Sequence, residues 1–290
     1  MARRFDTISF LSDYGTTDEF VGVVKAVVRD IAPHVTVIDL THGIPPFDVR
    51  AGAMTLARCI AYVPEGVVLA VVDPGVGTER RAVAVEVAGG AGVVIGPDNG
   101  LLGPAVALAG GAERAVVLTD ESYHLSSPGA TFAGRDVFAP VAAHVCNGVD
   151  LAELGEAIDP YLLLPSVVPL PRPEGSTIVC EALWVDRFGN VQLNVGRDDL
   201  DDAWGEGWGD RVRLRFGDHV RSLPIVASFG EIPPGGPGLV VDSYGMLAIA
   251  LDRFSAADEL GVGESDQITL EPAGDDDGGS ATPVGVRLGR

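Results

Sequence analysis

The chain has 290 residues, of which 47% are hydrophobic, and it carries a formal net charge of −21 at pH 7. This length allows a substantial buried core and two domains. The negative charge argues against a nucleic-acid-binding protein, because such a protein needs a basic patch to displace phosphate counterions. The longest apolar stretches fall short of the roughly 20 residues that a membrane-spanning helix needs.

The N-terminal segment and the cysteines favour a reduced, cytoplasmic protein. MARR is followed by a segment that contains Asp6 and Asp13, whereas a secretory signal peptide would continue with an apolar run. The three cysteines are odd in number and far apart, which favours reduced thiols over a disulfide framework: Cys59, Cys146 and Cys180. The five histidines lack the spacing of zinc ligands, so we expect no metal site.

Strand and helix patterns alternate through the first half of the chain. Short apolar runs predict strands at 7–12, 35–40, 67–72, 82–87, 92–96 and 115–119. Helical patterns lie between and after them, at Asp18–Ala32, Asp48–Val63 and Asp136–Val145. Asp18 and Asp48 stand where the N-caps of the first two helices would be. This alternation predicts an α/β domain with a largely parallel sheet, which we place at residues 1–170.

The pattern changes at the proline-rich segment Leu162–Gly175, which suits an extended connector. Beyond it the helical period disappears. Runs that predict strands, separated by Gly, Pro and Asp, lie at 177–186, 190–195, 211–216 and 246–251. We therefore expect a small all-β domain, an antiparallel barrel or sandwich, at residues 171–272. Residues 273–290 are acidic and of low complexity, which predicts a disordered tail.

Polar residues follow several of the predicted parallel strands. Asp13 and Asp73 each follow an apolar run, and the segments DLTHGIPPFD (39–48) and GPDNGLLG (96–103) follow two others. A single aspartate at a strand end is most often a turn former or a helix cap. Ligands of open parallel sheets bind beyond the carboxyl ends of the strands, so several such ends together favour a shared crevice.

Common phosphate and hydrolase motifs are absent from the sequence. It contains no P-loop, no G-x-G-x-x-G between a strand and a helix, and no G-x-S-x-G elbow. The strand-end carboxylates therefore match hydroxyl and ammonium donors better, such as a ribose diol or an amino acid. In the second half, WVDRFGNVQLNV predicts a β-hairpin whose turn presents Phe188 and Asn190, an aromatic face and an amide that suit adenine.

Taken together, six ordered segments resemble the S-adenosylmethionine hydroxide adenosyltransferases, the adenosine-forming S-adenosylmethionine hydrolases related to the fluorinases and chlorinases. The resemblance runs from about Thr7 to Leu270 in these segments: FLSDYGTTDEFVGVVKAVV, VIDLTHGIPPFDVRAGA, VVDPGVGTERR, GPDNGLL, TFAGRDVFAP and DRFGNVQLNV. It implies attack of water or hydroxide at C5′ of S-adenosylmethionine, giving adenosine and methionine without a cofactor. It also implies a homotrimer, with each site between the first domain of one subunit and the barrel of its neighbour.

The resemblance assigns the nucleoside part of the substrate to particular residues. Asp13 would bind the ribose diol, and Phe47 would line the ribose pocket. Asn190 would hydrogen-bond the edge of adenine. Three residues would sandwich the adenine ring: Pro74, Phe188 and Phe229. Ordinary core aromatics remain an alternative for Phe47 and Phe229.

The same resemblance places the methionine part of the substrate against Asp18, Asp186 and Ser243, and Phe132 belongs to the substrate-binding set as well. For Asp18 the role of a helix cap remains an alternative. Tyr244 stands where the halogenases carry an arginine that contacts the methionine carboxylate.

Asp73 and Arg80 match two members of the Asp-Arg-His set with which the hydrolases hold the attacking water, and we expect them to be catalytic. Ala133 stands at the position of the histidine. His124 from the same loop is one replacement, and Asp73 acting alone as proton acceptor is another. A protein that binds S-adenosylmethionine or adenosine with little turnover is a further alternative. Halide transfer is less favoured, because a carboxylate at position 73 would repel a halide.

Overall fold

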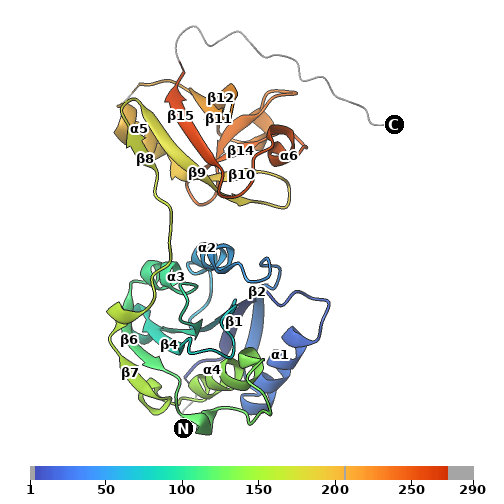
Figure 1. The fold of residues 1–290 in the computed structure, drawn as a ribbon, viewed down its shortest axis with the longest axis vertical. Coiled ribbons are helices and arrows are strands. Elements are labelled where there is room, and N and C mark those ends of the chain that lie inside the picture. Colours follow the sequence, from blue (N-terminus) through green and yellow to red (C-terminus); the bar gives the residue numbers. More distant parts are fainter. Residues whose placement is uncertain (1–3, 206, 274–290) are drawn as a thin grey trace. The chain divides into compact units, whose positions relative to one another are not determined.

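A computed structural model describes residues 4–205 and 207–273 (Figure 1). The chain forms two compact units, one up to Val168 and one from Pro169. Each unit has its own hydrophobic core. Most of the predicted acidic tail, residues 274–290, lies outside the described residues. No helix among the described residues is long and apolar enough to cross a membrane.

The first unit is built on a seven-stranded sheet in the order β2-β1-β3-β5-β4-β6-β7. The strands are β1 (Thr7–Ser12), β2 (Thr36–Thr41), β3 (Gly66–Val71), β4 (Ala82–Val87), β5 (Gly92–Pro97), β6 (Ala112–Val117) and β7 (Glu156–Ile158). β2, β1, β3 and β5 pair in parallel, while β4 is antiparallel to both β5 and β6. β6 therefore runs in the direction of β5, which confirms the predicted, largely parallel sheet.

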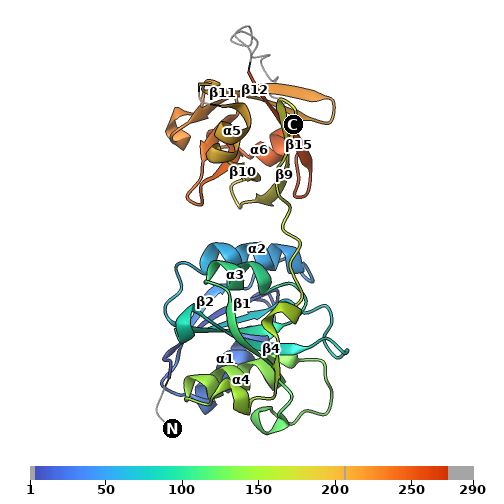
Figure 2. The ribbon, with the colours of Figure 1, turned by 90° about the vertical axis from the view of Figure 1, so that its left-hand side faces the viewer.

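Helices cover both faces of this sheet, as Figure 2 shows. They are α1 (Phe20–Ile31), α2 (Val49–Cys59), α3 (Gly103–Leu108) and α4 (Ala139–Cys146), with shorter turns η1 (Ala88–Gly90), η2 (Glu121–Tyr123), η4 (Leu151–Glu153) and η5 (Pro160–Leu162). A π-helical turn, η3 (Gly134–Phe138), leads into α4. Along β1, Ile8 and Phe10 pack into the core under α1 and α4, and Leu11 packs into the core under α2. This alternation places the sheet between two helical layers.

The two predicted helix caps have different outcomes. Asp48 is the N-cap of α2, and its carboxylate accepts a hydrogen bond from the backbone N–H of Ala51 at 2.8 Å, as predicted. Asp18 is not a cap: α1 begins at Phe20, Glu19 takes the N-cap position, and no side chain caps this helix.

The second unit is a closed barrel of seven strands. Its strands are β8 (Arg172–Glu174), β9 (Thr177–Val185), β10 (Val191–Gly196), β11 (Arg211–Phe216), β12 (His219–Val226), β13 (Gly238–Val241), β14 (Met246–Ala250) and β15 (Gln267–Pro272). Pairing of β10 with both β14 and β9 closes the barrel, and β8 extends β9 outside the closed ring. The predicted antiparallel arrangement is confirmed, except that β12 and β13 pair in parallel.

The barrel also contains helices, which the sequence pattern did not predict. They are α5 (Arg197–Trp204) and α6 (Ala256–Leu260), with a short turn η6 (Phe229–Glu231). Each helix buries a single residue in the core, Leu200 in α5 and Ala256 in α6. One buried position does not produce a visible helical period, so the pattern gave no sign of them.

Candidate functional site

Asp13 and Asp73 follow neighbouring strands at the carboxyl edge of the sheet. β1 and β3 are parallel, and their last residues Ser12 and Val71 are paired in register. The backbone N–H of Asp13 then donates to the carbonyl of Val71 at 3.3 Å. The two carboxylates therefore leave the sheet at the edge where the sequence predicted a crevice.

The Asp73 carboxylate forms a two-point ion pair with Arg80. Arg80 donates from Nε to Oδ1 at 3.0 Å and from Nη2 to Oδ2 at 2.5 Å. The Asp73 side chain is only 6% exposed, and the Arg80 side chain is 12% exposed. Burial raises the pKa of Asp73 above its usual range, while the Arg80 guanidinium opposes this shift. The pair thus presents an ionisable carboxylate whose basicity is greater than that of a free aspartate.

The turn between β3 and β4 makes this ion pair possible. The N–H of Val76 donates to the carbonyl of Asp73, and Thr78 N–H donates to Gly75, so the chain folds back within a few residues. Gly77 adopts a φ of 77°, and a Cβ atom there would lie 3.0 Å from the carbonyl oxygen of Ala130. Glycine is needed at this position because it adopts a positive φ without strain and because it has no Cβ atom to crowd the Ala130 carbonyl. Arg80 also lies over the ring of Phe138, 5.4 Å from its centroid.

Asp13 is held by the loop that follows β2. Its Oδ2 accepts a hydrogen bond from the backbone N–H of Phe47 at 2.9 Å. Phe47 has a φ of 68°, a left-handed conformation that is uncommon for residues other than glycine, and the residue is 71% exposed. Phe47 is therefore a surface aromatic beside Asp13, and the alternative that it belongs to the core is wrong.

A hydrogen-bonded chain, buried at Ser12 and His42, supports the same loop. Ser12 Oγ and His42 Nδ1 are 2.8 Å apart, and His42 Nε2 lies 3.1 Å from Asp39 Oδ1. Lys25 bonds the other oxygen of Asp39 at 2.5 Å. Gly15 N–H donates to the carbonyl of His42, which ties the loop after β1 to the loop after β2. The sequence did not predict this chain, because its members come from three separate segments.

Tyr14 is a further residue of this region that the sequence did not indicate. Its ring makes edge or tilted contacts with Phe20 and Phe132, each with 5.7 Å between centroids. Phe132, predicted to bind substrate, thereby lies in the same cluster. Burial raises the pKa of Tyr14, the Asp13 and Asp73 carboxylates raise it further, and Arg80 acts in the opposite direction. Tyr14 also directly follows Asp13, whose backbone N–H bonds the carbonyl of Val71 at the end of β3.

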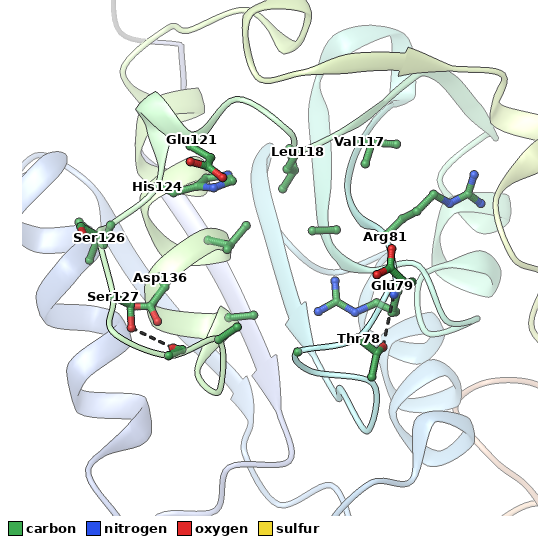
Figure 3. Close-up of a pocket in the computed structure, with 18 residues that line it drawn as sticks. Thr78, Glu79, Arg81, Val117, Leu118, Glu121, His124, Ser126, Ser127 and Asp136 are labelled. Carbon is green, nitrogen blue, oxygen red and sulfur yellow. Dashed lines mark hydrogen bonds between the residues drawn. The ribbon is translucent and has the colours of Figure 1, made fainter.

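A pocket of about 710 Å³ opens on the first unit next to this region (Figure 3). Its lining includes Arg80, Ala133 and His124. Figure 3 shows Glu121 and His124 on one wall, opposite the strand-turn segment that carries Thr78 and Glu79. His124 Nε2 is buried and, among the described residues, has no hydrogen-bond partner. Burial lowers the pKa of His124, so its ring is a neutral imidazole near pH 7.

The predicted hairpin of the second unit is confirmed, and Asp186 organises its turn. The carboxylate of Asp186 accepts from the N–H groups of Phe188 and Asn190 at 2.8 and 2.9 Å, and from Asn190 Nδ2 at 2.7 Å. The amide of Asn190 is therefore fixed in orientation, with its carbonyl oxygen directed away from Asp186. Phe188 is 77% exposed at the tip of this turn.

The remaining predicted binding residues lie at the surface. Ser243 is exposed in the turn between β13 and β14, where Asp242 accepts hydrogen bonds from the N–H groups of Tyr244 and Met246. Gln192 in β10 donates to Asp242 and so links this turn to the strand that follows Asn190. Phe229 is 53% exposed in η6, so it is not a core aromatic.

Asp18 and Pro74 are likewise exposed in the first unit, Asp18 before α1 and Pro74 directly after Asp73. The structure thus gathers Asp13, Phe47, Asp73, Arg80 and Phe132 in the first unit, and it brings Asp186 together with Asn190 in the second. Within residues 4–205 and 207–273, no three His, Cys, Asp or Glu side chains converge in a way that could hold a metal ion.

Comparison with known proteins shows to which family the chain is similar. Residues 8–155 match the N-terminal domain of the SAM hydroxide adenosyltransferases, and residues 180–269 match their C-terminal domain. The (R)-S-adenosyl-L-methionine hydrolase of Salinispora tropica is 45% identical over 263 residues, which cover 91% of this chain and 97% of that protein. A fluorinase of an Actinoplanes species is 30% identical over 84% of this chain and 90% of its own length.

A solved structure shows the same likeness. The crystal structure of an uncharacterized conserved protein from Thermotoga maritima superposes with a TM-score of 0.81 at 34% identity, covering 91% of this chain and 99% of that one. Both domains of the family match in order and together span most of the sequence. The chain therefore belongs to the SAM hydroxide adenosyltransferase family.

Proposed function

We propose that the protein hydrolyses S-adenosyl-L-methionine to adenosine and L-methionine. The observation that carries this proposal is the buried Asp73–Arg80 ion pair at the carboxyl edge of the sheet, where a carboxylate of raised pKa stands beside a fixed cation. The likeness of the chain to curated (R)-S-adenosyl-L-methionine hydrolases supports the same substrate.

The proposed reaction is an in-line displacement at C5′. The oxygen of water forms a bond to C5′ while the bond between C5′ and sulfur breaks, and the electron pair of that bond stays on the sulfur of methionine. Asp73 accepts a proton from the water and passes it to solvent. The sulfonium is already a good leaving group, so positioning of the water and exclusion of other solvent are the main tasks of the protein. Arg80 holds Asp73 in place and favours its ionised form.

We further propose the substrate contacts that the family resemblance implies. Asp13 binds the ribose diol beside Phe47, since its second oxygen remains able to accept hydrogen bonds. Asn190 bonds the adenine edge, and three residues hold the adenine faces: Pro74, Phe188 and Phe229. The exposure of Phe188 and Phe229 supports a role in binding. The methionine part is held by Asp18, Asp186 and Ser243. Phe132 also belongs to the substrate-binding residues.

We also propose that the reaction needs no cofactor and that the protein is a cytoplasmic homotrimer without nucleic-acid or membrane partners. The resemblance supports the trimer, and the acidic composition supports the absence of nucleic acid. Analytical ultracentrifugation tests the trimer directly: a mass of three chains supports it, and a monomer contradicts it.

Halide transfer is the activity from which hydrolysis must be distinguished, since fluorinases are among the relatives. The buried Asp73 carboxylate argues against it, because a negative charge at the nucleophile site repels a halide ion.

The experiment that tests the proposal is chromatography of the protein incubated with S-adenosylmethionine, with and without high chloride. Adenosine and methionine in equal amounts support hydrolysis. A 5′-chloro nucleoside would indicate a halide transferase instead. Tight binding by calorimetry without any product would indicate a protein that sequesters S-adenosylmethionine.

A further inference from the structure

The Tyr14 hydroxyl lies against the π-helical turn η3, and the Arg80 guanidinium lies over the ring of Phe138 in the same turn. Tyr14 follows β1 directly after Asp13, and its ring lies in a cluster with Phe10, Phe20 and Phe132. The ring centroids are 5.7 Å from those of Phe20 and Phe132. Aromatic edge packing of this kind holds a ring in one orientation, so the position of the phenol oxygen is fixed as well.

The hydroxyl lies against the first residue of the π-helical turn. A Cβ atom on Gly134 would be 2.1 Å from Tyr14 Oη, so the phenol oxygen occupies the space that any larger residue at position 134 would fill. Gly134 begins η3 immediately after Ala133. π-helical turns are rare, and they occur frequently at functional sites. The turn therefore provides room for the hydroxyl at this point.

The hydroxyl is neutral and available. Burial and the nearby carboxylates Asp13 and Asp73 hold the pKa of Tyr14 well above its usual range, although Arg80 opposes them. Among the residues that the structure describes, none forms a hydrogen bond with this hydroxyl. A neutral phenol can donate one hydrogen bond and accept another, so Tyr14 retains its full capacity to bind a water molecule.

His124 is the other candidate for a polar group next to Ala133, since both line the same pocket as Arg80. The charges that act on His124, however, are those of Glu121 and Asp120 on its own loop. Those that act on Tyr14 are Asp13, Asp73 and Arg80. Tyr14 and His124 are therefore the two candidates, and the variants below distinguish them.

Resting on the hydrolysis proposed above, we propose that Tyr14 is a water-positioning residue, whose hydroxyl hydrogen-bonds the attacking water beside Asp73. The water oxygen bonds to C5′, the C5′–S bond breaks with its electron pair going to sulfur, and the water proton goes to Asp73. Tyr14 keeps its own proton throughout. Its contribution is to direct the water toward C5′ at a position where Ala133 offers no polar group.

The test is the Tyr14→Phe variant, which removes only the hydroxyl and leaves the ring cluster in place. We expect kcat to fall on the order of 10- to 100-fold, the effect of losing one hydrogen bond at a reacting group, with KM and the melting temperature little changed. Unchanged kcat would overturn the proposal. A rise in KM at constant kcat would also overturn it, because it would indicate a role in substrate binding only.

A second substitution makes the test independent of folding effects. Ala133 precedes Gly134 and lines the same pocket as Arg80, so Ala133→His introduces an imidazole into that pocket. We expect Ala133→His to raise kcat more in the Tyr14→Phe background than in the unmodified chain, a non-additivity that shows a shared task. Equal factors in both backgrounds would contradict the proposal.

The His124→Gln variant separates the two candidates. We expect it to keep the kcat of the unmodified protein, and a loss there with none in Tyr14→Phe would overturn the proposal. If the unmodified protein gives no adenosine, the proposed hydrolysis itself fails. If the unmodified protein is active and Tyr14→Phe is equally active, only the role of Tyr14 fails.

Discussion

Arg80 and Asp73 face each other across one short turn between β3 and β4, and the guanidinium bonds both oxygens of the carboxylate. Asp73 follows the end of β3, and Arg80 stands just before the start of β4. Two antagonistic effects meet in this pair: burial favours the neutral carboxyl group, and the arginine favours the carboxylate. The result is a proton acceptor whose pKa is raised and whose direction is fixed by the guanidinium.

The Asp73→Asn variant is expected to lower turnover by on the order of 10²-fold or more, since an amide cannot take the proton from water. Substrate binding should change much less. Steady-state kinetics and calorimetry measure the two effects separately. An unaltered rate would show that the water site has been assigned wrongly.

Arg81 offers a matched control for the adjacent arginine. Arg81 pairs with Asp98 and with the carbonyl oxygen of Leu162 in place of Asp73. We expect Arg80→Ala to lower turnover by on the order of 10²-fold, and Arg81→Ala to act on stability alone. Equal losses of kcat in the two variants would argue against a specific role for Arg80.

The pH dependence follows from the same pair. Asp73 accepts a proton only when it is ionised, so kcat/KM should fall as the pH falls through its raised pKa. Because Arg80 lowers that pKa, the Arg80→Gln variant should move the acidic limb to higher pH. Arg80→Lys, which keeps the positive charge, should move it less. A pH–rate profile with an unmoved acidic limb would contradict Asp73 as the titrating group.

Phe47 allows backbone strain and substrate contact to be separated. Both Phe47→Gly and Phe47→Ala remove the ring and should raise KM about fivefold, corresponding to ~1 kcal/mol of aromatic contact. Only glycine relieves the positive φ of 68°, so the Gly variant should be more stable than the Ala variant by about 1 kcal/mol. Denaturation and kinetics of the two variants together check this, and unchanged KM in both would exclude Phe47 from the ribose pocket.

Effects on stability and on substrate binding can also be separated at the Asp186 turn of the barrel. Asp186→Ala removes the acceptor of three hydrogen bonds and should both lower the melting temperature and weaken binding. Asn190→Ala removes one side-chain donor to Asp186 and the amide assigned to adenine, so it should weaken binding with a smaller loss of stability. If Asn190→Ala bound the substrate normally, its assignment to the adenine edge would be wrong.

Local patterns predicted much of this architecture. The nearly continuous apolar run of 67–72 predicted β3 because strands buried on both faces carry few polar residues. The cap at Asp48 was readable because Asp48 immediately precedes a helical pattern. Asp73 directly follows an apolar run, and a carboxylate at the carboxyl end of a predicted parallel strand indicated the crevice.

Relationships between distant segments were not readable in this way. Tyr14 meets Gly134 only because β1 and the π-helical turn come together in the folded chain. The chain from Ser12 through His42 to Asp39 depends on the parallel pairing of β1 with β2. Neither arrangement leaves a periodic or spacing signal in the sequence, because tertiary packing creates both.

The most direct test of the central claim is hydrolysis of S-adenosylmethionine in ¹⁸O-labelled water, with mass spectrometry of both products. Attack of water at C5′ predicts one labelled oxygen in adenosine, at the 5′-hydroxyl group, and none in methionine. Adenosine without the label, label in methionine, or the absence of adenosine would contradict the account.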